Sequence, residues 1–421
     1  MSNLRVLIVG ASIAGPTAAY WLSRAGARVT IIERFPQLRT AGQNIDIRTA
    51  GVNVMRKMPG MEAAVRAKTT QMDGMSWVRD DGRPYGPIRA TGDPDQQSLV
   101  SEYEIFRGDL AKILFDMTKD DESIEYMFGE QVVSMQQSGN EDGPLTVVFA
   151  NGLATSEYDL VLACDGATSR TRALGFGCGV REHVEPMNCW AAYFSIKEDL
   201  LKGSKVAQGY SAVGGRCFFV GPDPSGVSRA TLMGLHPQGD RDATLPFREA
   251  MKQGDDALKQ FLARYFEGAG WRINELLEGM METGDFYASE IVQVKLPNLY
   301  KGRFALVGDA GYAPGFTGGG TSLALAGAYL LAGEISKHDG DLAAGLKGYE
   351  EQMGPIITDM QKVPPLIRTI MAPQTAWGIW LRNNIFAFIA WTRILEVVQK
   401  YFAAAFASTD AHKLPNYEWV A

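Results

Sequence analysis

A glycine-rich segment near the start of the chain has the spacing of a dinucleotide-binding turn. The segment GASIAG occupies residues 10–15, between an apolar run at residues 4–9 and a helical pattern. The end glycines permit a tight turn, and the helix N-terminus offers free N–H groups and a positive dipole end to a pyrophosphate. Glu33 ends the next apolar run, where a carboxylate can accept hydrogen bonds from ribose hydroxyls. The pattern predicts a nucleotide site that includes Gly10, Ser12, Ile13, Ala14, Gly15, Glu33 and Arg34.

Ser12 occupies the position at which this pattern has its middle glycine. Serine is small, so the backbone can still approach a phosphate, and its hydroxyl can donate a hydrogen bond. The succession of strand, turn, helix, strand and acid favours a nucleotide site over a glycine-rich turn of another α/β protein. This segment alone does not distinguish NAD from FAD.

Two further segments follow apolar runs and combine aspartate with glycine. The first, DGATSRTR, begins at Asp165 and ends at Arg172. The second, GDAGYAPGFTGGGTS, begins at Gly308 and ends at Ser322, where an Ala- and Leu-rich helical pattern starts. An aspartate directly after a strand can also be a plain helix cap, so each segment by itself is a weak signal.

The three segments together resemble the fingerprint, DG and GD motifs of the class A FAD-dependent aromatic hydroxylases. This is the para-hydroxybenzoate hydroxylase group, and the tetracycline-inactivating monooxygenases are a close branch of it. The resemblance extends from about Asn3 to Gln352, with all three motifs in the family's order. It implies that FAD is the bound cofactor.

The third segment carries the largest share of the implied cofactor contacts. By the resemblance, Asp309 would accept a hydrogen bond from a ribityl hydroxyl of FAD. The loop at residues 314–320 and the next helix N-terminus would face the flavin pyrimidine edge and stabilise negative charge on the reduced ring. The other residues expected at the cofactor here are Gly308, Pro314, Gly318, Gly319, Gly320, Thr321 and Ser322.

Five more residues match family positions near the cofactor. Asp165 and Arg172 would support the fold around FAD and the approach of NAD(P)H. Arg107, in EIFRGDLAKIL, would contact the cofactor near its pyrophosphate, with a solvated helix residue as the less favoured alternative. Asp46 and Arg48, in GQNIDIRTAG, fall where the family places a loop beside the flavin, and an ordinary loop remains an equal alternative.

The third segment also departs from the family pattern. Many members have GDAAH followed by two prolines, whereas this chain has Gly311, Tyr312 and the single Pro314. Members often carry Gln or Lys within the glycine run, which here is uninterrupted at residues 318–320. A relaxed loop can change how the flavin moves, so the resemblance supports cofactor binding more firmly than the kinetics of its reduction.

The implied chemistry is mainly that of the cofactor. NADPH or NADH would reduce FAD as a transient co-substrate, and O2 would then give a flavin C4a-hydroperoxide that hydroxylates or epoxidises a small aromatic or polycyclic substrate. No second GxGxxG gives the nicotinamide a domain of its own. A halogenase shares the fold, but its WxWxIP segment is absent. A flavin oxidoreductase or dehydrogenase without oxygen insertion, and a non-catalytic FAD-binding protein, remain as alternatives.

Such chemistry needs a water-poor pocket, because water diverts the activated oxygen to H2O2. We expect this pocket between the flavin and the aromatic segments at residues 190–233. No residue can be identified as a catalytic acid or base. The candidate pocket residues, each of which could also be plain core, are Trp190, Tyr193, Phe218, Phe219 and Met233.

The distribution of patterns predicts an α/β fold with a Rossmann-like FAD-binding domain interrupted by an antiparallel-sheet substrate domain and followed by a C-terminal helical segment. Buried parallel strands are indicated at both ends of the chain, and aromatic, β-branched segments separated by Gly and Pro lie between them. We predict the FAD-binding domain at 1–74, 101–176 and 285–355, the substrate domain at 75–100 and 177–284, and C-terminal helices at 356–421.

Composition excludes several other classes. A length of 421 residues favours two domains, and a net charge of −7 without a basic run argues against nucleic-acid binding. The four cysteines and four histidines show no metal-ligand spacing, so we expect reduced thiols and no metal site. A strand pattern begins within four residues and no signal-peptide pattern precedes it, so we expect a cytoplasmic protein. The oligomeric state is not readable from the sequence.

The segment at residues 377–406 is strongly apolar but is interrupted by Arg382, Asn383, Asn384 and Arg393. No run of about 18 apolar residues survives, so we expect no membrane-spanning helix. We expect helices packed across the junction of the two domains, with a membrane-surface helix or an oligomer contact as alternatives. The side chains expected to be buried there are Trp377, Trp380, Ile385, Phe386, Phe388, Ile389 and Trp391.

Overall fold

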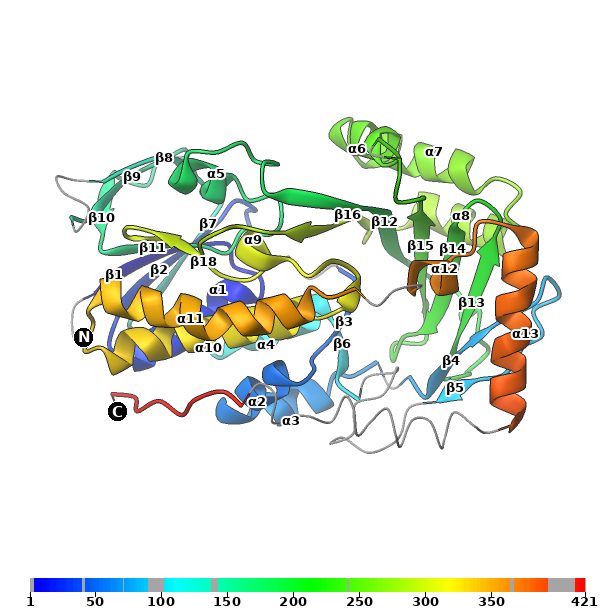
Figure 1. Ribbon diagram of the computed structural model, residues 1–421, viewed down its shortest axis with the longest axis horizontal. Helices are drawn as coiled ribbons and strands as arrows, with labels where there is room; N and C mark the ends of the chain where they lie inside the picture. Colours follow the sequence, from blue (N-terminus) through cyan, green and yellow to red (C-terminus); the bar gives the residue numbers. More distant parts are fainter. Residues whose placement is uncertain are drawn as a thin grey trace.

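The computed structural model describes residues 4–39, 42–70, 72–89, 102–137, 143–240, 242–363, 367–392 and 413–420. These residues form two large sheets at opposite ends of an elongated molecule (Figure 1). One sheet is mainly parallel and the other mainly antiparallel, so the predicted fold class is confirmed.

The mainly parallel sheet has six strands, of which the central ones are buried on both faces. This burial explains why their sequences are uninterrupted apolar runs. All neighbours are parallel except the edge pair. In spatial order the strands are β17 (Tyr300–Lys301), β18 (Phe304–Leu306), β11 (Leu160–Ala163), β1 (Arg5–Val9), β2 (Arg28–Glu33) and β7 (Ile124–Phe128).

Helices and a small sheet cover the two faces of this parallel sheet. Val6 and Ile8 of β1 belong to the main core, which includes helix residues such as Leu22 and Leu325. Leu7 and Val9 point the other way, into a second core. The helical layer contains α1 (Ala14–Arg24), α2 (Ala50–Lys57), α3 (Met61–Arg66), α4 (Arg107–Asp116), α10 (Gly320–Lys337) and α11 (Leu342–Met360). The opposite layer is the sheet of β8 (Val132–Gln137), β9 (Leu145–Phe149) and β10 (Ser156–Tyr158), next to α5 (Arg170–Phe176).

The second large sheet has seven strands and is antiparallel except where β13 meets β4. Its predicted range ended at residue 284, but the sheet continues through the edge strand at 287–294. In order, the strands are β16 (Tyr287–Val294), β12 (Val184–Ile196), β15 (Ser228–Leu235), β14 (Arg216–Pro222), β13 (Val206–Ala212), β4 (Gly74–Trp77) and β5 (Ile88–Arg89). One face packs on α6 (Leu245–Lys252), α7 (Asp255–Phe266) and α8 (Ile273–Glu282).

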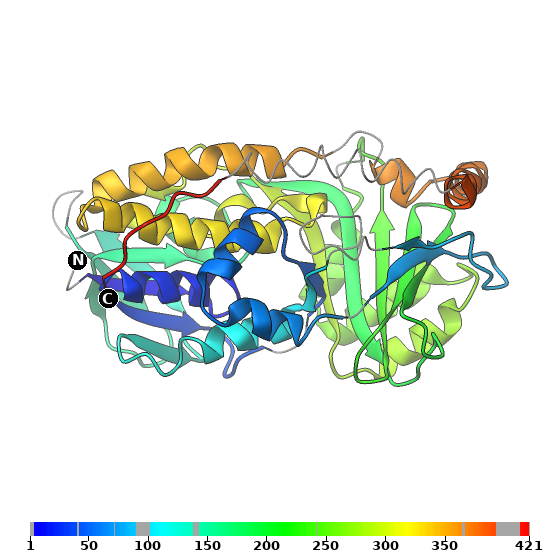
Figure 2. The ribbon, with the colours of Figure 1, turned by 90° about the horizontal axis from the view of Figure 1, so that it is seen from below.

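Short elements link the two sheets. The strands β3 (Asn44–Asp46) and β6 (Glu104–Phe106) pair between them, and α9 (Asp309–Tyr312) follows β18. In both ribbon views the long strands β12 and β16 run from the antiparallel sheet toward the parallel one (Figures 1 and 2). The molecule therefore has a junction where residues from both sheets meet.

The C-terminal part contains the predicted helices but differs in detail. The expected boundary at residue 355 falls inside α11, which ends at Met360. The helices α12 (Ile367–Met371) and α13 (Ala376–Thr392) follow, and α13 lies against the antiparallel sheet. Residues 413–420 then form an extended strap along α10 on the parallel-sheet domain (Figure 2). Residues 393–406 of the predicted apolar tail lie outside the described residues.

The expectation that the aromatic tail is buried is wrong for most of its side chains. Trp377, Trp380, Ile385, Phe388 and Trp391 are exposed, because they share the face of α13 that points away from the sheet. Phe386 and Ile389 are partly buried. Among the described residues, no helix combines the length and the hydropathy that a membrane crossing requires.

Candidate functional site

The carboxyl ends of four neighbouring strands bring the glycine-bearing segments together. The strands β18, β11, β1 and β2 lie side by side in parallel, so the residues that follow them meet at one edge of the sheet. The GD segment follows β18, the DG segment follows β11 and the fingerprint follows β1, while Glu33 ends β2. In parallel sheets ligands bind at this edge.

The first turn is so closely packed that two of its positions exclude any side chain. Gly10 has φ +113°, and a Cβ there would lie 2.6 Å from the Cys164 carbonyl oxygen. A Cβ at Gly15 would lie 1.9 Å from the Gly10 carbonyl oxygen. The N-cap Ile13 gives α1 no side-chain cap, and the first turn carries no acid. With Ser12 only half-buried, the helix N-terminus has the free N–H groups and the dipole that bind an anion.

Glu33 is joined to the same turn. One of its carboxylate oxygens accepts a hydrogen bond from the Ala11 N–H, and the other accepts one from the Phe35 N–H, both at 3.1 Å. A carboxylate has about four lone-pair sites, so further acceptor capacity remains for hydroxyl donors. Arg34 is exposed, and its guanidinium lies 4.9 Å from the centre of the Phe35 ring.

The GD segment lies between the N-termini of α1 and α10. Gly308 has φ +72°, and a Cβ there would lie 2.9 Å from the Ala14 Cβ and 3.5 Å from the Ala324 Cβ. Asp309 is exposed, yet the surrounding protein desolvates its carboxyl and raises its pKa, an effect that Arg107 opposes. The Asp309 carboxyl is therefore accessible to a ligand at the strand ends.

The glycine run forms the start of α10 and contacts the β3–α2 loop. The N-cap Gly319 leaves α10 without a side-chain cap, and a Cβ at Gly320 would lie 3.2 Å from the Asp309 Oδ1. The buried Ser322 hydroxyl accepts a hydrogen bond from the Arg48 N–H at 2.9 Å. Thr321 is buried as well, whereas Gly318 is exposed. A second uncapped helix N-terminus therefore lies beside Asp309.

The loop that was expected beside the flavin does lie next to this helix start. Asp46 and Arg48 form an ion pair at 2.8 Å, and a Cβ at Gly318 would lie 3.9 Å from the Asp46 Oδ2. Thr49 has φ +39°, which β-branched residues rarely adopt. Backbone strain of this kind concentrates at ligand-binding loops.

The DG segment stabilises the site through buried hydrogen bonds. Asp165 accepts hydrogen bonds from the hydroxyls of Ser169 and Thr171 and so shapes the start of α5. Arg172 is fully buried and donates to the carbonyls of Ala310 and Val180, both at 2.7 Å. Since Ala310 belongs to α9, this arginine joins the DG segment to the GD segment.

Two arginines lie beside one tyrosine, and only one of them, Arg107, was predicted from the sequence. The guanidinium groups of Arg107 and Arg39 each lie 5.9 Å from the centre of the Tyr287 ring. Burial and the neighbouring Arg107 lower the pKa of Arg39. Arg39 and Tyr287 were missed because they come from distant segments, and only the position of Arg39 shortly after Glu33 hinted at it. Two like charges this close favour an anionic ligand.

The five predicted pocket residues are divided between the two faces of the antiparallel sheet. Tyr193, Phe219 and Met233 share one face, where they pack with Phe316 from the GD loop. Trp190 and Phe218 lie in the core on the opposite face, beneath α6 and α7. Their positions are explained by strand alternation, since neighbouring residues point to opposite sides. Trp190 and Phe218 therefore belong to the core under α6 and α7 and do not line the candidate pocket.

Three functional candidates at this face were not found in the sequence. The buried Arg382 guanidinium of α13 lies 3.7 Å from the centre of the Trp77 ring and donates to the Ser211 hydroxyl at 3.0 Å. Arg368 of α12 lies 5.4 Å from the centre of the Phe316 ring. The Gln293 amide of β16 donates to the Pro314 carbonyl at 3.1 Å. The available signal for Gln293 was a polar residue between two buried valines, Val292 and Val294.

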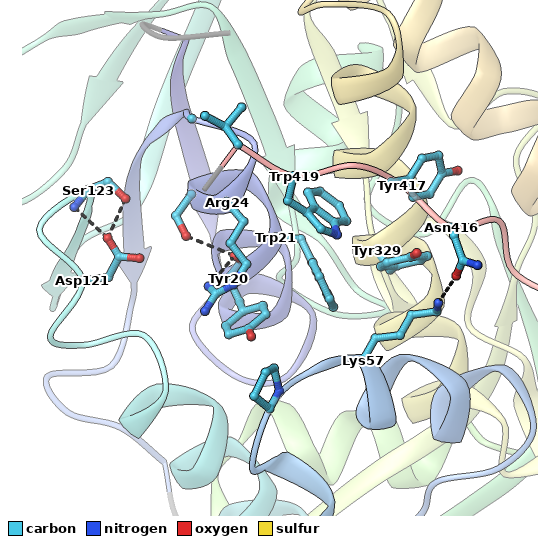
Figure 3. Close-up of a pocket in the computed structure, with 14 residues that line it drawn as sticks. Tyr20, Trp21, Arg24, Lys57, Asp121, Ser123, Tyr329, Asn416, Tyr417 and Trp419 are labelled. Carbon is cyan, nitrogen blue, oxygen red and sulfur yellow. Dashed lines mark hydrogen bonds between the residues drawn. The ribbon is translucent and has the colours of Figure 1, made fainter.

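A groove of about 740 Å3 lies away from this edge, between the C-terminal strap and α1 (Figure 3). Tyr20, Trp21 and Arg24 of α1 line it together with Tyr417 and Trp419 of the strap, and the centres of the Trp21 and Trp419 rings lie 4.8 Å apart. None of the glycine-bearing segments lines this groove. Its side chains already bond to one another, as in the contact of the Arg24 guanidinium with the Tyr20 ring, 3.5 Å from its centre.

Comparisons with known proteins show the family of the chain. The family described as "FAD binding domain" matches residues 3–361 of the chain. The FAD-dependent monooxygenase asL4 of Sarocladium schorii is 33% identical over 419 residues, and the monooxygenase CTB7 of Cercospora beticola is 32% identical over 404 residues. Each alignment covers 94% of both proteins. The crystal structure of the tetracycline destructase Tet(55) is similar over 99% of both chains, with 30% identity and a TM-score of 0.75.

Proposed function

The chain belongs to the FAD binding domain family as an FAD-dependent monooxygenase of class A type, and from this we propose that it uses NADPH or NADH and O2 to hydroxylate or epoxidise a small aromatic or polycyclic molecule. The observation that carries the proposal is the contact of the GD loop, through Phe316, with the apolar face of the antiparallel sheet. This contact supports a substrate site at the junction of the two sheets.

The residues at the strand ends have the chemistry to bind each part of FAD. The free N–H groups of α1 would hold the pyrophosphate, and Glu33 would accept hydrogen bonds from the ribose hydroxyls. Asp309 would accept one from the ribityl chain, and Arg107 would approach a phosphate. The N-terminus of α10 would face the flavin ring and stabilise negative charge there. When bound, FAD supplies hydride acceptance and oxygen activation.

The opposite wall is apolar and would hold the substrate. Tyr193, Phe219 and Met233 offer a mainly aromatic surface, and burial raises the pKa of the Tyr193 phenol, so this group stays protonated and neutral. An apolar wall excludes water from the reacting atoms, which favours oxygen transfer over H2O2 release. Tet(55) is named a tetracycline destructase. Because tetracycline is a polycyclic molecule, this name supports a flat, polycyclic substrate class for this chain.

The test measures whether an oxygen atom of O2 is incorporated into an organic product. The purified FAD-loaded protein is reduced anaerobically with NADPH or NADH and mixed with isotope-labelled O2 in the presence of planar phenols or tetracycline. We expect label in an organic product and less H2O2 when a substrate is present. A protein whose reduced flavin passes its electrons only to quinone or dye acceptors, and never incorporates label, would be a dehydrogenase instead. A protein that NADPH and NADH both fail to reduce would contradict the proposed co-substrate.

A further inference from the structure

The helix α13 has two chemically different faces. Its inner face is anchored on the antiparallel sheet by the buried Arg382 and Asn383, and Phe386 joins the apolar cluster of the proposed pocket. Its outer face is exposed and almost entirely apolar. The exposed fractions there are 69% for Trp377, 59% for Trp380, 49% for Ile385, 57% for Phe388 and 80% for Trp391.

These five side chains, which we call the outer stripe, form one continuous surface. Trp377, Trp380, Phe388 and Trp391, with the exposed Asn384 between them, follow at intervals of three or four residues and so project from one side of the helix, and Ile385 borders them. At about 150–250 Å2 for each aromatic side chain, the stripe exposes on the order of 700 Å2. This exceeds the roughly 300–600 Å2 of the largest patch on a typical monomer. It approaches the roughly 800 Å2 that each partner of a stable complex buries.

The stripe is nearly symmetric about its centre. Asn384 is exposed and lies seven residues from both Trp377 and Trp391, while Trp380 and Phe388 lie four residues on either side. An antiparallel pairing of two such helices would place Trp377 against Trp391 of the second copy, and Trp380 against its Phe388. A surface that is complementary to itself in this way is what a two-fold dimer requires. A central polar residue can fix the register of paired helices.

We propose that the outer stripe of α13 binds the outer stripe of a second copy of this chain, in antiparallel register about Asn384. The charge pattern favours this occupant over a lipid surface. A surface-bound membrane helix carries a Lys- and Arg-rich polar face. The one basic residue of α13 is Arg382, which is buried on the inner face, and the chain has a net charge of −7.

The contact would also hold α13 in place over the sheet. Because Phe386 and Arg382 contact the face that carries Trp77 and Met233, a second copy on the outer side would restrain the helix that borders the proposed pocket. The dimer itself does not depend on the proposed reaction, so its test can fail without affecting that proposal.

The first test measures mass in solution. The full-length FAD-loaded protein is examined by sedimentation velocity and light scattering over a wide concentration range. We expect a dimer, and Trp380→Glu/Phe388→Glu should weaken self-association about 100-fold or more, since central aromatic residues each contribute about 2 kcal/mol or more to such contacts. FAD content and Tm should stay unchanged. The matched control is Val133→Glu/Leu174→Glu, at positions 53% and 41% exposed on the other domain, which should remain dimeric.

The second test measures register. Asn384→Cys should form a disulfide-linked dimer under mild oxidation, because the same residue of the second copy lies opposite, whereas Val133→Cys and the unsubstituted chain should not. A wild-type protein that is monomeric at all concentrations would overturn the proposal. So would a dimer that survives Trp380→Glu/Phe388→Glu. A monomer that floats with anionic or neutral vesicles, and loses this binding in the same variant, would identify the stripe as a membrane surface instead.

Discussion

At the scale of single residues, Asp309 tests the cofactor assignment. It is exposed, and its carboxylate lies beside the uncapped start of α10. Asp309→Ala should weaken FAD binding by roughly 1.5–3 kcal/mol, the usual contribution of a hydrogen bond to a charged group. Fluorescence titration of the apoprotein with FAD measures this change. The control Asp359→Ala removes an exposed carboxylate of α11, and equal FAD affinity in the two variants would refute the assigned role.

Arg107 tests the anion-binding cluster. Its guanidinium shares the Tyr287 ring with Arg39, and no role in the apolar core is visible for it. Arg107→Ala should therefore lower FAD occupancy after purification while changing the free energy of unfolding of the apoprotein by no more than about 1 kcal/mol. The exposed Arg264→Ala serves as the control. Full FAD occupancy in Arg107→Ala would show that this arginine does not touch the cofactor.

The residue types in the three motifs could be predicted from the sequence because glycine and aspartate there have local causes. Gly10 and Gly308 are required by positive φ angles and by close neighbours. The pocket residues were harder, since a strand shows alternation but not which of its faces meets the cofactor domain. Trp190 and Tyr193 look equally suitable in the sequence and lie on opposite faces.

At the scale of elements, the β3–β6 pair should make stability depend on pH. Burial and the Asp46 carboxylate on the opposite strand raise the pKa of Glu104 to about 7. The folded protein then binds a proton more tightly than the unfolded chain, so this contribution is full below about pH 4 and is lost as pH rises through 7. It amounts to about 3 kcal/mol at most.

The substitution Glu104→Gln removes this titration. We expect the difference in unfolding free energy between pH 5 and pH 8.5 to shrink by about 1–3 kcal/mol, with the variant the more stable protein at the higher pH. Urea unfolding at both pH values, with excess FAD, measures it. The exposed Glu157→Gln should behave as wild type. An unchanged pH dependence in Glu104→Gln would show that Glu104 is ionised in the folded protein at neutral pH.

The close packing of the C-terminal strap on α10 should make stability sensitive to added volume at their contact (Figure 3). Tyr417 packs against α10 so closely that a Cβ at Gly333 would lie 2.0 Å from its ring, and its hydroxyl donates to Glu334 at 2.7 Å. Gly333→Ala should thus destabilise the protein by about 1–3 kcal/mol through overpacking. In a Tyr417→Ala background the same change should stabilise by up to about 1 kcal/mol, because alanine is the better helix former. Thermal unfolding of the four proteins measures the coupling, and additive effects would mean that the strap lies elsewhere.

The C-terminal elements also show where sequence reasoning stops. Apolar periodicity correctly indicated helices there. It could not tell burial within one chain from burial against a second one, because both need the same residues. Trp377 and Trp391 are large apolar residues of the kind found in a core, yet they are exposed.

At the scale of the whole molecule, the two sheets are joined by side chains that no local pattern could pair. The Gln293 amide of the antiparallel sheet donates to the Pro314 carbonyl of the cofactor loop and to the Gln361 carbonyl after α11. The fold class and the order of motifs could be predicted, since each strand and turn has its own local signal. The junction could not, because it depends on contacts between segments far apart in the sequence.

The central claim is that FAD lies along the strand ends with its ring against the apolar face of the antiparallel sheet. The crystal structure of the FAD-loaded protein tests it most directly. We expect the pyrophosphate at the N-terminus of α1, a ribityl oxygen about 3 Å from the Asp309 carboxylate, and the ring between the 314–320 loop and Tyr193, Phe219 and Met233. A dinucleotide seated elsewhere, or a ring that cannot reach this face in any substrate-bound form, would contradict the account.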